Sequence, residues 1–305
     1  MISRRHFIKT LTGLGLLSAL DPYAALAASP SIITRAIPST GEQIPVIGMG
    51  SWLTFDVAYN EQRMATRVQV LQEFFDRGGA LIDSSPMYGS SEMVIGHCLN
   101  QIKNKQALFS ATKVWTQGQR QGVKQMQASR EKWGVDRFDL MQVHNMVDWE
   151  THLETLKAWK TEGRIRYIGI TTSHGRRHRD LERALSNEAF DFVQFTYNVL
   201  DREVEQRLLP LAAERGIAVI INRPFQRGSL FSQVNGEPLP AWASDIDCAN
   251  WAQFFLKFIV SHPAVTCAIP ATSRVEHMAE NMGAAYGRLP DARMRQRMTQ
   301  YVENL

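Results

Sequence analysis

The sequence predicts an α/β fold in which eight parallel strands, each followed by a helix, close into a single (β/α)8 barrel. From Ile32 onward, short β-branched runs alternate with amphipathic segments, which is the pattern of consecutive βα units. Runs such as 193–196 and 218–221 are apolar on both faces, as expected of strands covered by helices outside and by a filled interior. A length of 305 residues is one that such barrels reach around one core. We therefore expect one domain of the TIM-barrel type.

The eight strands are predicted individually from their β-branched and apolar content. They span residues 44–52, 80–85, 107–115, 138–145, 165–173, 190–198, 217–225 and 265–272. Helical patterns lie between them, for example over 62–77 and 149–162, where apolar residues recur on one face. Glycines mark the expected helix ends before the next strands, at Gly78, Gly134, Gly163 and Gly216. An open doubly wound sheet is the alternative, but no G-x-G-x-x-G turn opens its first helix.

The amino terminus has the features of an export signal. A polar motif with paired arginines comes first, with Ser3, Arg4, Arg5, Phe7 and Lys9. An apolar stretch follows it, and residues 25–27 are the small residues expected at a cleavage site. The apolar stretch of about ten residues is well below the ~20 that span a bilayer. The segment resembles a twin-arginine signal peptide over residues 1–27. The resemblance implies that the twin-arginine export machinery delivers residues 28–305 to the periplasm, or another extracytoplasmic compartment, without a stable membrane anchor. A basic amphipathic leader or a disordered start is the alternative.

Charge and cysteine content exclude several classes of partner. The formal net charge is +4, and without Arg4, Arg5, Lys9 and Asp21 of the signal segment, 31 basic side chains face 29 acidic ones. This balance argues against nucleic acid binding. The three cysteines are widely spaced and form neither a disulfide framework nor a zinc-binding pattern. We expect no nucleic acid partner and no metal site.

Polar side chains stand at the carboxyl ends of the predicted strands two, three and four, where barrels of this type hold their chemistry. Asp83 and Tyr88 flank the end of strand two, Lys113 lies near the end of strand three, and His144 ends strand four. Each alone has an ordinary explanation: a helix cap, a loop aromatic, a lysine that reaches solvent, or a core histidine. Together, at successive strand ends, they predict a catalytic group.

These four residues resemble the catalytic tetrad of the aldo-keto reductases, in which an aspartate five residues before a tyrosine is followed by a lysine and a histidine from the next two strands. The similarity includes residues 48–52, 111–115, 163–170 and 269–281, and it extends over nearly all of 32–286. The resemblance implies an oxidoreductase that transfers a hydride between a nicotinamide cofactor and a small aldehyde, ketone or alcohol.

Elementary chemistry assigns a role to each member of the group. Reduction of a carbonyl requires a proton at its oxygen as negative charge develops there. A tyrosine hydroxyl, with a free pKa of about 10, is a poor acid until neighbours stabilise its anion. We expect the Lys113 ammonium to stabilise the anion of Tyr88, Asp83 to keep that lysine charged, and His144 to donate to the carbonyl and orient it.

The resemblance implies that the nicotinamide carboxamide is held from the predicted strands five and six. Thr171, Thr172 and Gln194 occupy those positions, and Gln194 is favoured because a carboxamide requires a partner that both donates and accepts. Many members stack a tyrosine under the nicotinamide at the end of strand seven. This chain has Asn222 there, so support for the ring must come from another residue or be weaker.

Two segments near the carboxyl terminus are predicted to hold the phosphates of the cofactor. Arg223 and the loop through Gly228 and Leu230 suit a pyrophosphate, although an arginine that caps helix carbonyls is the alternative. A 2′-phosphate requires hydroxyls, an arginine and a helix amino terminus. The chain supplies these after strand eight, with Thr272, Arg274, Glu280 and Asn281. Ala271 and His277 stand where many members carry lysine and arginine, so NADP(H) is favoured and NAD(H) is the alternative.

Large apolar side chains near the tetrad are predicted to line a substrate pocket, with the segment 231–247 folding over it. These residues are Trp52, Trp115, Met146 and Trp149. Trp52 and Trp115 are equally consistent with a packing role. The expected substrate is a small carbonyl or alcohol compound.

Two other functions are compatible with the sequence. A cofactor-retaining binding or sensor protein with little turnover would suit export to a compartment without reduced nicotinamide, and also the missing stacking tyrosine. A metal-dependent barrel hydrolase would need paired histidine or carboxylate ligands, which do not accompany His144.

Overall fold

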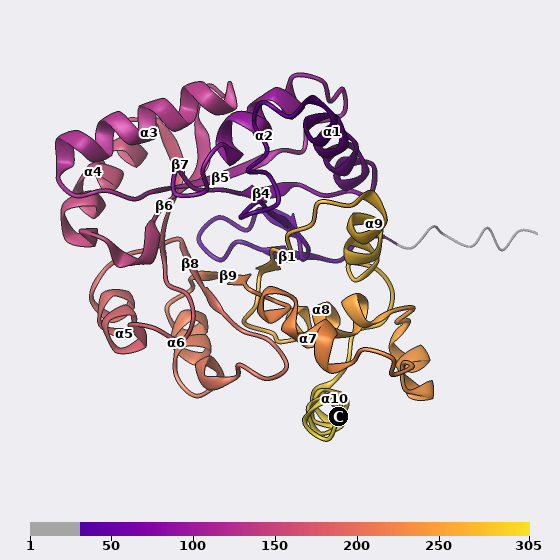
Figure 1. The fold of residues 1–305 in the computed structure, drawn as a ribbon. Helices are drawn as coiled ribbons and strands as arrows, with labels where there is room; N and C mark the ends of the chain where they lie inside the picture. The colour runs from indigo at the N-terminus through magenta and orange to yellow at the C-terminus, as the bar shows by residue number, and fades with distance from the viewer. Residues whose placement is uncertain (1–30) are drawn as a thin grey trace, which may run out of the picture. The chain divides into compact units, whose positions relative to one another are not determined.

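The computed structural model describes residues 31–305, and eight parallel strands form their centre, in the order β10-β9-β8-β7-β6-β5-β4-β3 (Figure 1). The strands are β3 (Met49–Gly50), β4 (Leu81–Asp83), β5 (Phe109–Val114), β6 (Phe138–Val143), β7 (Ile165–Thr171), β8 (Phe192–Thr196), β9 (Ala218–Asn222) and β10 (Cys267–Ala268). Backbone bonds join the two end strands: the Gly48 N–H donates to Ala268 O at 2.9 Å and the Gly50 N–H to Pro270 O at 3.0 Å. The sheet is therefore a closed barrel, and the predicted fold class is confirmed.

Helices surround the barrel, as Figure 1 shows. They are α1 (Glu61–Asp76), α2 (Ser91–Leu99), α3 (Gln119–Trp133), α4 (Trp149–Thr161), α5 (His178–Asn187), α6 (Leu208–Glu214), α7 (Ser229–Gln233), α8 (Trp251–Val260), α9 (Val275–Gly283) and α10 (Ala292–Glu303). Helix α1 begins where the Asn60 side chain accepts from the Arg63 N–H at 2.9 Å. None of the described helices has the length and hydropathy needed to span a bilayer. The predicted signal peptide, 1–27, lies outside the described residues.

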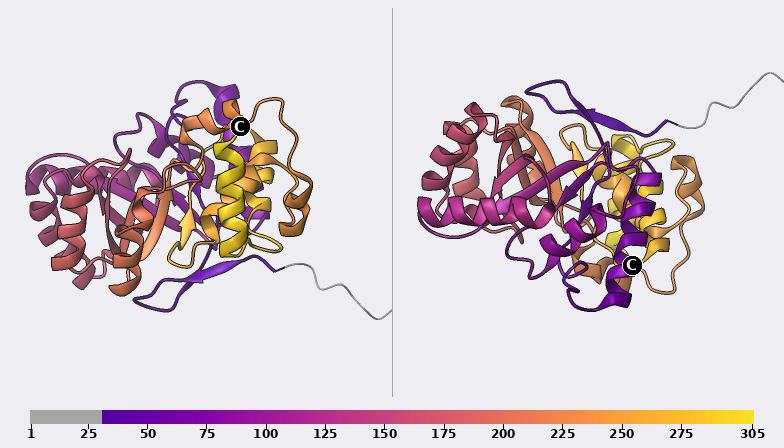
Figure 2. Two further views of the ribbon diagram at one scale, coloured as in Figure 1. Left: turned by 90° about the horizontal axis from the view of Figure 1, so that it is seen from below. Right: turned by 90° about the horizontal axis from the view of Figure 1, so that it is seen from above.

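An antiparallel hairpin closes the amino-terminal end of the barrel (Figure 2). It consists of β1 (Thr34–Ala36) and β2 (Gln43–Pro45), and Ile37 and Ile44 join the apolar cluster inside the barrel. The predicted first strand over 44–52 is thus divided in two. Ile44 pairs with Arg35 of the hairpin, whereas Met49 pairs with Ile82 of the barrel, because the chain changes partner between them.

The interior of the barrel changes from apolar to polar toward the carboxyl ends of the strands. Side chains on a strand alternate between faces, so every second residue points inward. The interior apolar cluster includes Leu81, Ala111, Leu140, Phe192 and Ile220. Two residues further along the same strands stand Asp83, Lys113, Gln142, Gln194 and Asn222. The alternation therefore places a layer of polar side chains at the mouth of the barrel, directly next to its apolar interior.

Candidate active site

A buried ion pair between Lys113 and Asp83 forms the centre of the polar layer. Lys113 is 0% exposed and Asp83 is 2% exposed. The Lys113 Nζ lies 2.5 Å from Asp83 Oδ2 and donates a second bond to Ser84 O at 2.8 Å. Burial lowers the pKa of Lys113, and the charge of Asp83 opposes that shift. The carboxylate therefore favours the charged form of a lysine that has no contact with solvent.

Two amide side chains hold the other oxygen of this carboxylate. Gln142 Nε2 and Gln194 Nε2 both donate to Asp83 Oδ1, at 2.9 and 3.0 Å. Gly169 makes room for the first amide, because a Cβ at that position would lie 2.7 Å from Gln142 Cγ. Gln142 was not among the residues predicted from sequence. Its position two residues before His144, and therefore on the same face of β6, was the available signal.

Tyr88 and His144 lie against this ion pair, so the structure brings all four predicted residues together. The Tyr88 and His144 rings are 5.6 Å apart between centroids with an interplanar angle of 86°. The Lys113 Nζ lies 5.2 Å from the centroid of the Tyr88 ring. The two rings and the ammonium are thus close neighbours at the mouth of the barrel.

The pKa of Tyr88 shifts in the direction opposite to the one expected from sequence. Burial, and then the charge of Asp83, raise the pKa of the Tyr88 hydroxyl well above its ordinary value. Lys113 donates to Asp83 and to Ser84 and lies over the face of the Tyr88 ring, so among the described residues its ammonium is not hydrogen-bonded to the hydroxyl. Tyr88 is therefore a phenol that keeps its proton at neutral pH.

His144 is held as a neutral imidazole by its surroundings. It is 5% exposed, and burial, together with the nearby Lys113 charge, lowers its pKa well below the ordinary value. Its Nδ1 lies 2.8 Å from Ser85 Oγ, which also accepts the Met87 N–H at 3.2 Å. A serine hydroxyl that accepts from a backbone N–H has its own proton available for Nδ1, and this favours the tautomer with hydrogen on Nε2. Ser85 was missed as a site residue, although it stands two residues after the end of strand β4.

The side chains predicted to hold the nicotinamide gather at the ends of β7, β8 and β9. Asn222 Nδ2 donates to Thr172 O at 2.9 Å and to Gln194 Oε1 at 3.3 Å, and its Oδ1 accepts from Thr196 Oγ1 at 2.7 Å. Thr171 Oγ1 accepts the Asn145 N–H at 3.0 Å. Asn222 is therefore part of a hydrogen-bonded polar network in the place where a stacking ring would stand.

Gln194 forms more hydrogen bonds within the protein than its predicted role as a cofactor ligand suggested. Both of its N–H groups have partners, since Nε2 donates to Asp83 Oδ1 and to Gln142 Oε1 at 3.2 Å. Its Oε1 accepts one bond, from Asn222, and has the capacity for a second. In this arrangement Gln194 offers a ligand an acceptor but no donor.

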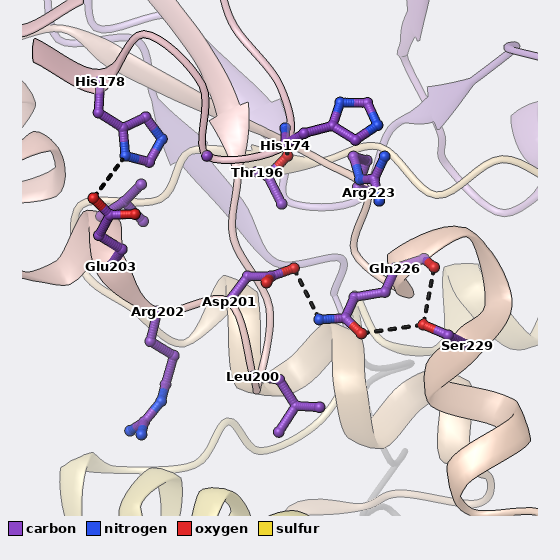
Figure 3. Close-up of a pocket in the computed structure, with 12 residues that line it drawn as sticks. His174, His178, Thr196, Leu200, Asp201, Arg202, Glu203, Arg223, Gln226 and Ser229 are labelled. Atoms are coloured by element: carbon purple, nitrogen blue, oxygen red, sulfur yellow. Dashed lines mark hydrogen bonds and ion pairs between the residues drawn. The ribbon is translucent and has the colours of Figure 1, made fainter.

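The loop after β9 places the predicted pyrophosphate residues in different surroundings. The Gly228 N–H donates to Phe225 O at 2.8 Å within the loop, and Leu230 is fully buried. The Arg223 guanidinium has no hydrogen bond or ion pair among the described residues, and it borders a polar pocket between the loops that follow β7, β8 and β9 (Figure 3). Beyond it, the Arg227 guanidinium lies 4.3 Å from the centroid of the Trp52 ring.

The predicted 2′-phosphate residues lie at the start of α9 and along it. Thr272 is buried and its Oγ1 accepts the Arg274 N–H at 3.1 Å, so its hydroxyl shapes the turn into the helix. The Arg274 side chain is exposed, with Nε 3.7 Å from Glu276 Oε2. Glu280 and Asn281 follow on α9, the first half-buried and the second buried. An exposed cation therefore stands beside a helix amino terminus.

The four predicted pocket residues divide into two pairs. Trp115 is 41% exposed and its ring lies 6.5 Å from that of His144. Trp52 is half-buried and lies beside the Arg227 guanidinium. Met146 is 1% exposed and belongs to the core between sheet and helices. Trp149 packs against that core with its ring 6.5 Å from Phe190. The first pair borders the barrel mouth, and the second pair contributes to the core in this structure.

The segment 231–247, expected to fold over the pocket, instead packs on the outer helices. The Trp242 ring lies 5.7 Å from Phe254 of α8 and 5.8 Å from Tyr301 of α10. The Trp251 indole N–H donates to Glu237 O at 2.9 Å. Within residues 31–305, no three histidine, cysteine, aspartate or glutamate side chains are placed to share a metal ion.

Comparison with protein families connects this arrangement to known chemistry. A family model described as the aldo/keto reductase family matches residues 46–299. Aldo-keto reductase YhdN of Bacillus subtilis is 27% identical over 217 residues, which cover 66% of this chain and 65% of that protein. The NADH-specific methylglyoxal reductase of Escherichia coli is 27% identical over 231 residues, covering 65% of this chain and 68% of its own length. The match thus spans about two thirds of the length of these two relatives.

Solved structures share the fold at lower sequence identity. An aldo-keto reductase from Klebsiella pneumoniae in complex with NADPH has a TM-score of 0.73 at 21% identity, and the match covers 89% of this chain and 95% of that one. An aldo-keto reductase from Bombyx mori in complex with NADP has a TM-score of 0.70 at 20% identity, with 89% and 94% covered. At this level of identity, the likeness shows a shared barrel.

Proposed function

The chain belongs to the aldo/keto reductase family, and from this premise we propose that it is an NADP(H)-dependent oxidoreductase of the carbonyl reductase or alcohol dehydrogenase type. It reduces a small aldehyde or ketone to an alcohol, or catalyses the reverse reaction. The observation that carries the proposal is a chain of neighbours at the carboxyl ends of three adjacent strands: a buried carboxylate paired with an ammonium, a phenol against that ammonium, and a neutral imidazole against the phenol. Relatives named as reductases, and structures named as complexes with NADP, support the reaction class and the cofactor.

In the proposed reduction, Tyr88 is the proton donor and His144 the group that orients the substrate. When bound, the nicotinamide supplies a hydride to the carbonyl carbon. The Tyr88 Oη–H is transferred to the carbonyl oxygen, and its raised pKa keeps that proton in place until the oxygen becomes basic. The His144 Nε2–H donates to the same oxygen and fixes its direction. Lys113 then opposes the negative charge left on Tyr88, and Asp83 keeps the lysine charged.

The side chains of the mouth and of α9 fit a nicotinamide nucleotide with a 2′-phosphate. Gln194 Oε1 has acceptor capacity for a carboxamide N–H, and the exposed Arg274 beside the start of α9 suits a phosphate. We propose NADP(H) as the preferred cofactor on this ground. Replacing Arg274 with alanine is expected to weaken NADPH binding and leave NADH binding unchanged, with Arg293→Ala on α10 as the matched control. Equal loss for both cofactors would argue against a 2′-phosphate at this position.

Turnover tests the proposal directly. Purified protein mixed with NADPH and a panel of aromatic and aliphatic aldehydes is expected to consume NADPH, followed by its absorbance, with at least one of them. Failure with every aldehyde, and with alcohols and NADP⁺ in the reverse direction, would count against an oxidoreductase.

A second candidate function, a binding or sensor protein that retains its cofactor, is favoured by one contact. Arg227 after β9 and Trp52 after β3 meet at 4.3 Å, so they join the two loops on either side of β10. A contact of this kind would slow exchange of a nucleotide held beneath it. Denaturing natively produced protein and measuring the released nucleotide discriminates between the two functions, because a freely exchanging reductase loses most of its cofactor during purification.

We also propose that the protein is exported through the twin-arginine route to the periplasm or an equivalent compartment. The support is the sequence of the first 27 residues, with Arg4 and Arg5 adjacent. Replacing both arginines with lysine is expected to retain the protein in the cytoplasmic fraction. Unchanged export of that variant would contradict the route.

A further inference from the structure

A serine two residues after Tyr88 joins the turn that carries the phenol to the loop that follows β3. The N–H and the hydroxyl of Ser90 both donate to Asp56 Oδ1, at 2.9 and 2.7 Å. The Ser90 Oγ also accepts the Ala58 N–H at 3.1 Å. Three hydrogen bonds therefore connect residues 56–58, which follow β3, with a residue of the turn that follows β4.

Ser90 forms these bonds in place of the one that its position usually provides. It is the N-cap of α2, where a serine side chain commonly accepts a backbone N–H from the first turn of the helix. The Ser90 side chain forms no such capping bond. Its hydroxyl is bonded to the loop 56–58 instead, so this side chain connects two loops and does not cap its own helix.

Gly89, between Tyr88 and Ser90, allows the Asp56 carboxylate to approach the backbone of the turn. Its φ is 59°, in the left-handed region, and a Cβ at this position would lie 2.5 Å from both carboxylate oxygens of Asp56. The bonds from the Ser90 N–H and hydroxyl lower the pKa of Asp56, so the carboxylate is charged at neutral pH. A charged acceptor therefore lies directly against the residue that follows Tyr88.

The loop that carries Asp56 is anchored on both sides of that residue. Phe55 and Val57 are buried in the core between the sheet and the helices. The buried Arg67 of α1 donates through Nε to Thr54 O. Asp56 is itself exposed, but the backbone on either side of it is held in place by these contacts.

The position of the Tyr88 hydroxyl depends on the turn that carries it. The Tyr88 ring is packed edge-on against His144, and the Lys113 ammonium lies over it. The backbone bonds of Tyr88 lie within the turn, because its N–H donates to Ser85 O at 2.9 Å and its carbonyl accepts the Ser91 N–H at 3.1 Å. The contact between Asp56 and Ser90 ties this turn to a neighbouring loop, so it limits how far the phenol can move relative to a bound substrate.

We propose that Asp56 is a positioning residue for proton transfer: through Ser90 it holds the turn 85–91 so that the Tyr88 hydroxyl is directed at the carbonyl oxygen of the substrate. The inference rests on the proposed function, in which Tyr88 supplies the proton. A displacement of about 1 Å in a reacting group costs about 10²-fold in rate. Loss of the contact should therefore slow the chemical step and leave cofactor binding as it is.

Two substitutions of Asp56 test this role in single-turnover reactions with NADPH and an aldehyde that the wild type reduces. Asp56→Ala removes the acceptor and is expected to lower the rate about 10- to 100-fold, with an unchanged dissociation constant for NADPH. Its solvent deuterium isotope effect should rise, because proton transfer becomes slower relative to the other steps. Asp56→Asn keeps an oxygen that accepts from both Ser90 donors, so it should retain the wild-type rate to within about twofold.

A control and a measurement without substrate complete the test. Asp291→Ala removes a carboxylate that accepts the Met294 N–H at 2.7 Å at the start of α10, and it should keep the wild-type rate. Exchange of the Ser90 amide hydrogen, measured on the protein without substrate, should be faster in Asp56→Ala and unchanged in Asp56→Asn and Asp291→Ala. If Asp56→Ala does not fold, Ser90→Ala serves instead, with a lower rate again expected; it leaves α2 intact because this side chain does not cap the helix.

Several results would overturn the inference and leave the proposed function standing. These are a wild-type rate in Asp56→Ala, a loss explained by weaker NADPH binding, an Asp56→Asn variant as slow as Asp56→Ala, or unchanged exchange at Ser90 in Asp56→Ala. A wild type without turnover on any substrate would instead overturn the proposed function, and this inference with it. The two failures are therefore distinguished by the wild-type rate.

Discussion

Replacing Lys113 with methionine is expected to destabilise the protein strongly, because it leaves Asp83 charged and buried without its cation. Breaking a buried ion pair by removing one partner costs about 3–5 kcal/mol. Asp83 keeps the donors Gln142 and Gln194 at 2.9 and 3.0 Å, so we expect the lower end of that range. A loss of about 3 kcal/mol lowers the folding equilibrium constant roughly a hundredfold. Turnover should be lost as well.

A double variant separates the charge from the packing. In Lys113→Met combined with Asp83→Asn, no charge is left in the layer, and the Asn carbonyl can still accept from the two glutamines. Replacing both partners of a buried pair is often neutral, so the double variant should recover to within about 1 kcal/mol of wild type while remaining inactive.

Urea unfolding followed by fluorescence, with turnover measured on the same samples, provides the assay. We expect an unstable single variant and a stable but inactive double variant. If the double variant were as unstable as Lys113→Met, the loss would come from packing around residue 113 and not from the unpaired charge of Asp83, which would refute the electrostatic explanation.

Three further predictions concern the surroundings of the site. Ser85→Ala should lower kcat about 2- to 10-fold, because His144 loses one hydrogen bond worth about 0.5–1.5 kcal/mol; an unchanged kcat would contradict a role in setting the tautomer. Burial raises the pKa of Glu92 in the folded protein, so the wild type loses free energy of unfolding as pH rises from 4.5, whereas Glu92→Gln has no charge to bury. The free energy of unfolding of Glu92→Gln should therefore increase relative to that of wild type over this pH range. A difference in urea unfolding that does not depend on pH would refute this. Arg227→Gln should speed nucleotide release about 2- to 5-fold in stopped-flow measurements, since it removes a cation–π contact with Trp52 worth about 0.5–1 kcal/mol; unchanged release would show that the contact does not hold the ligand.

The barrel and the four central residues could be predicted from sequence because both follow local rules. Strand ends and inward-facing positions depend on alternation along one strand, so the strand pattern alone places Asp83, Lys113 and His144 at a common mouth. The helix boundaries predicted for α1 and α4 differ from the observed ones by one residue at most at each end. Alternation along β6 would also have identified Gln142, had it been applied to every interior position.

Other features depend on contacts between distant segments, which a single sequence does not specify. The raised pKa of Tyr88 comes from burial and from the charge of Asp83, and both are properties of the assembled barrel. Met146 and Trp149 were predicted at the substrate pocket from their proximity in sequence to His144. A left-handed turn at Asn145 and Met146 follows that histidine, and the two apolar side chains lie in the core.

The most direct test of the proposed chemistry is a single-turnover measurement on Tyr88→Phe with NADPH bound and an aldehyde added. The proposed role predicts a rate of NADPH oxidation lowered by about 10²- to 10⁴-fold and an unchanged dissociation constant for NADPH. Tyr286→Phe, which removes a phenol that donates to Arg77 O far from the tetrad, is the matched control and should retain the wild-type rate. A Tyr88→Phe enzyme that reduced the aldehyde at the wild-type rate would contradict the role of Tyr88 as proton donor.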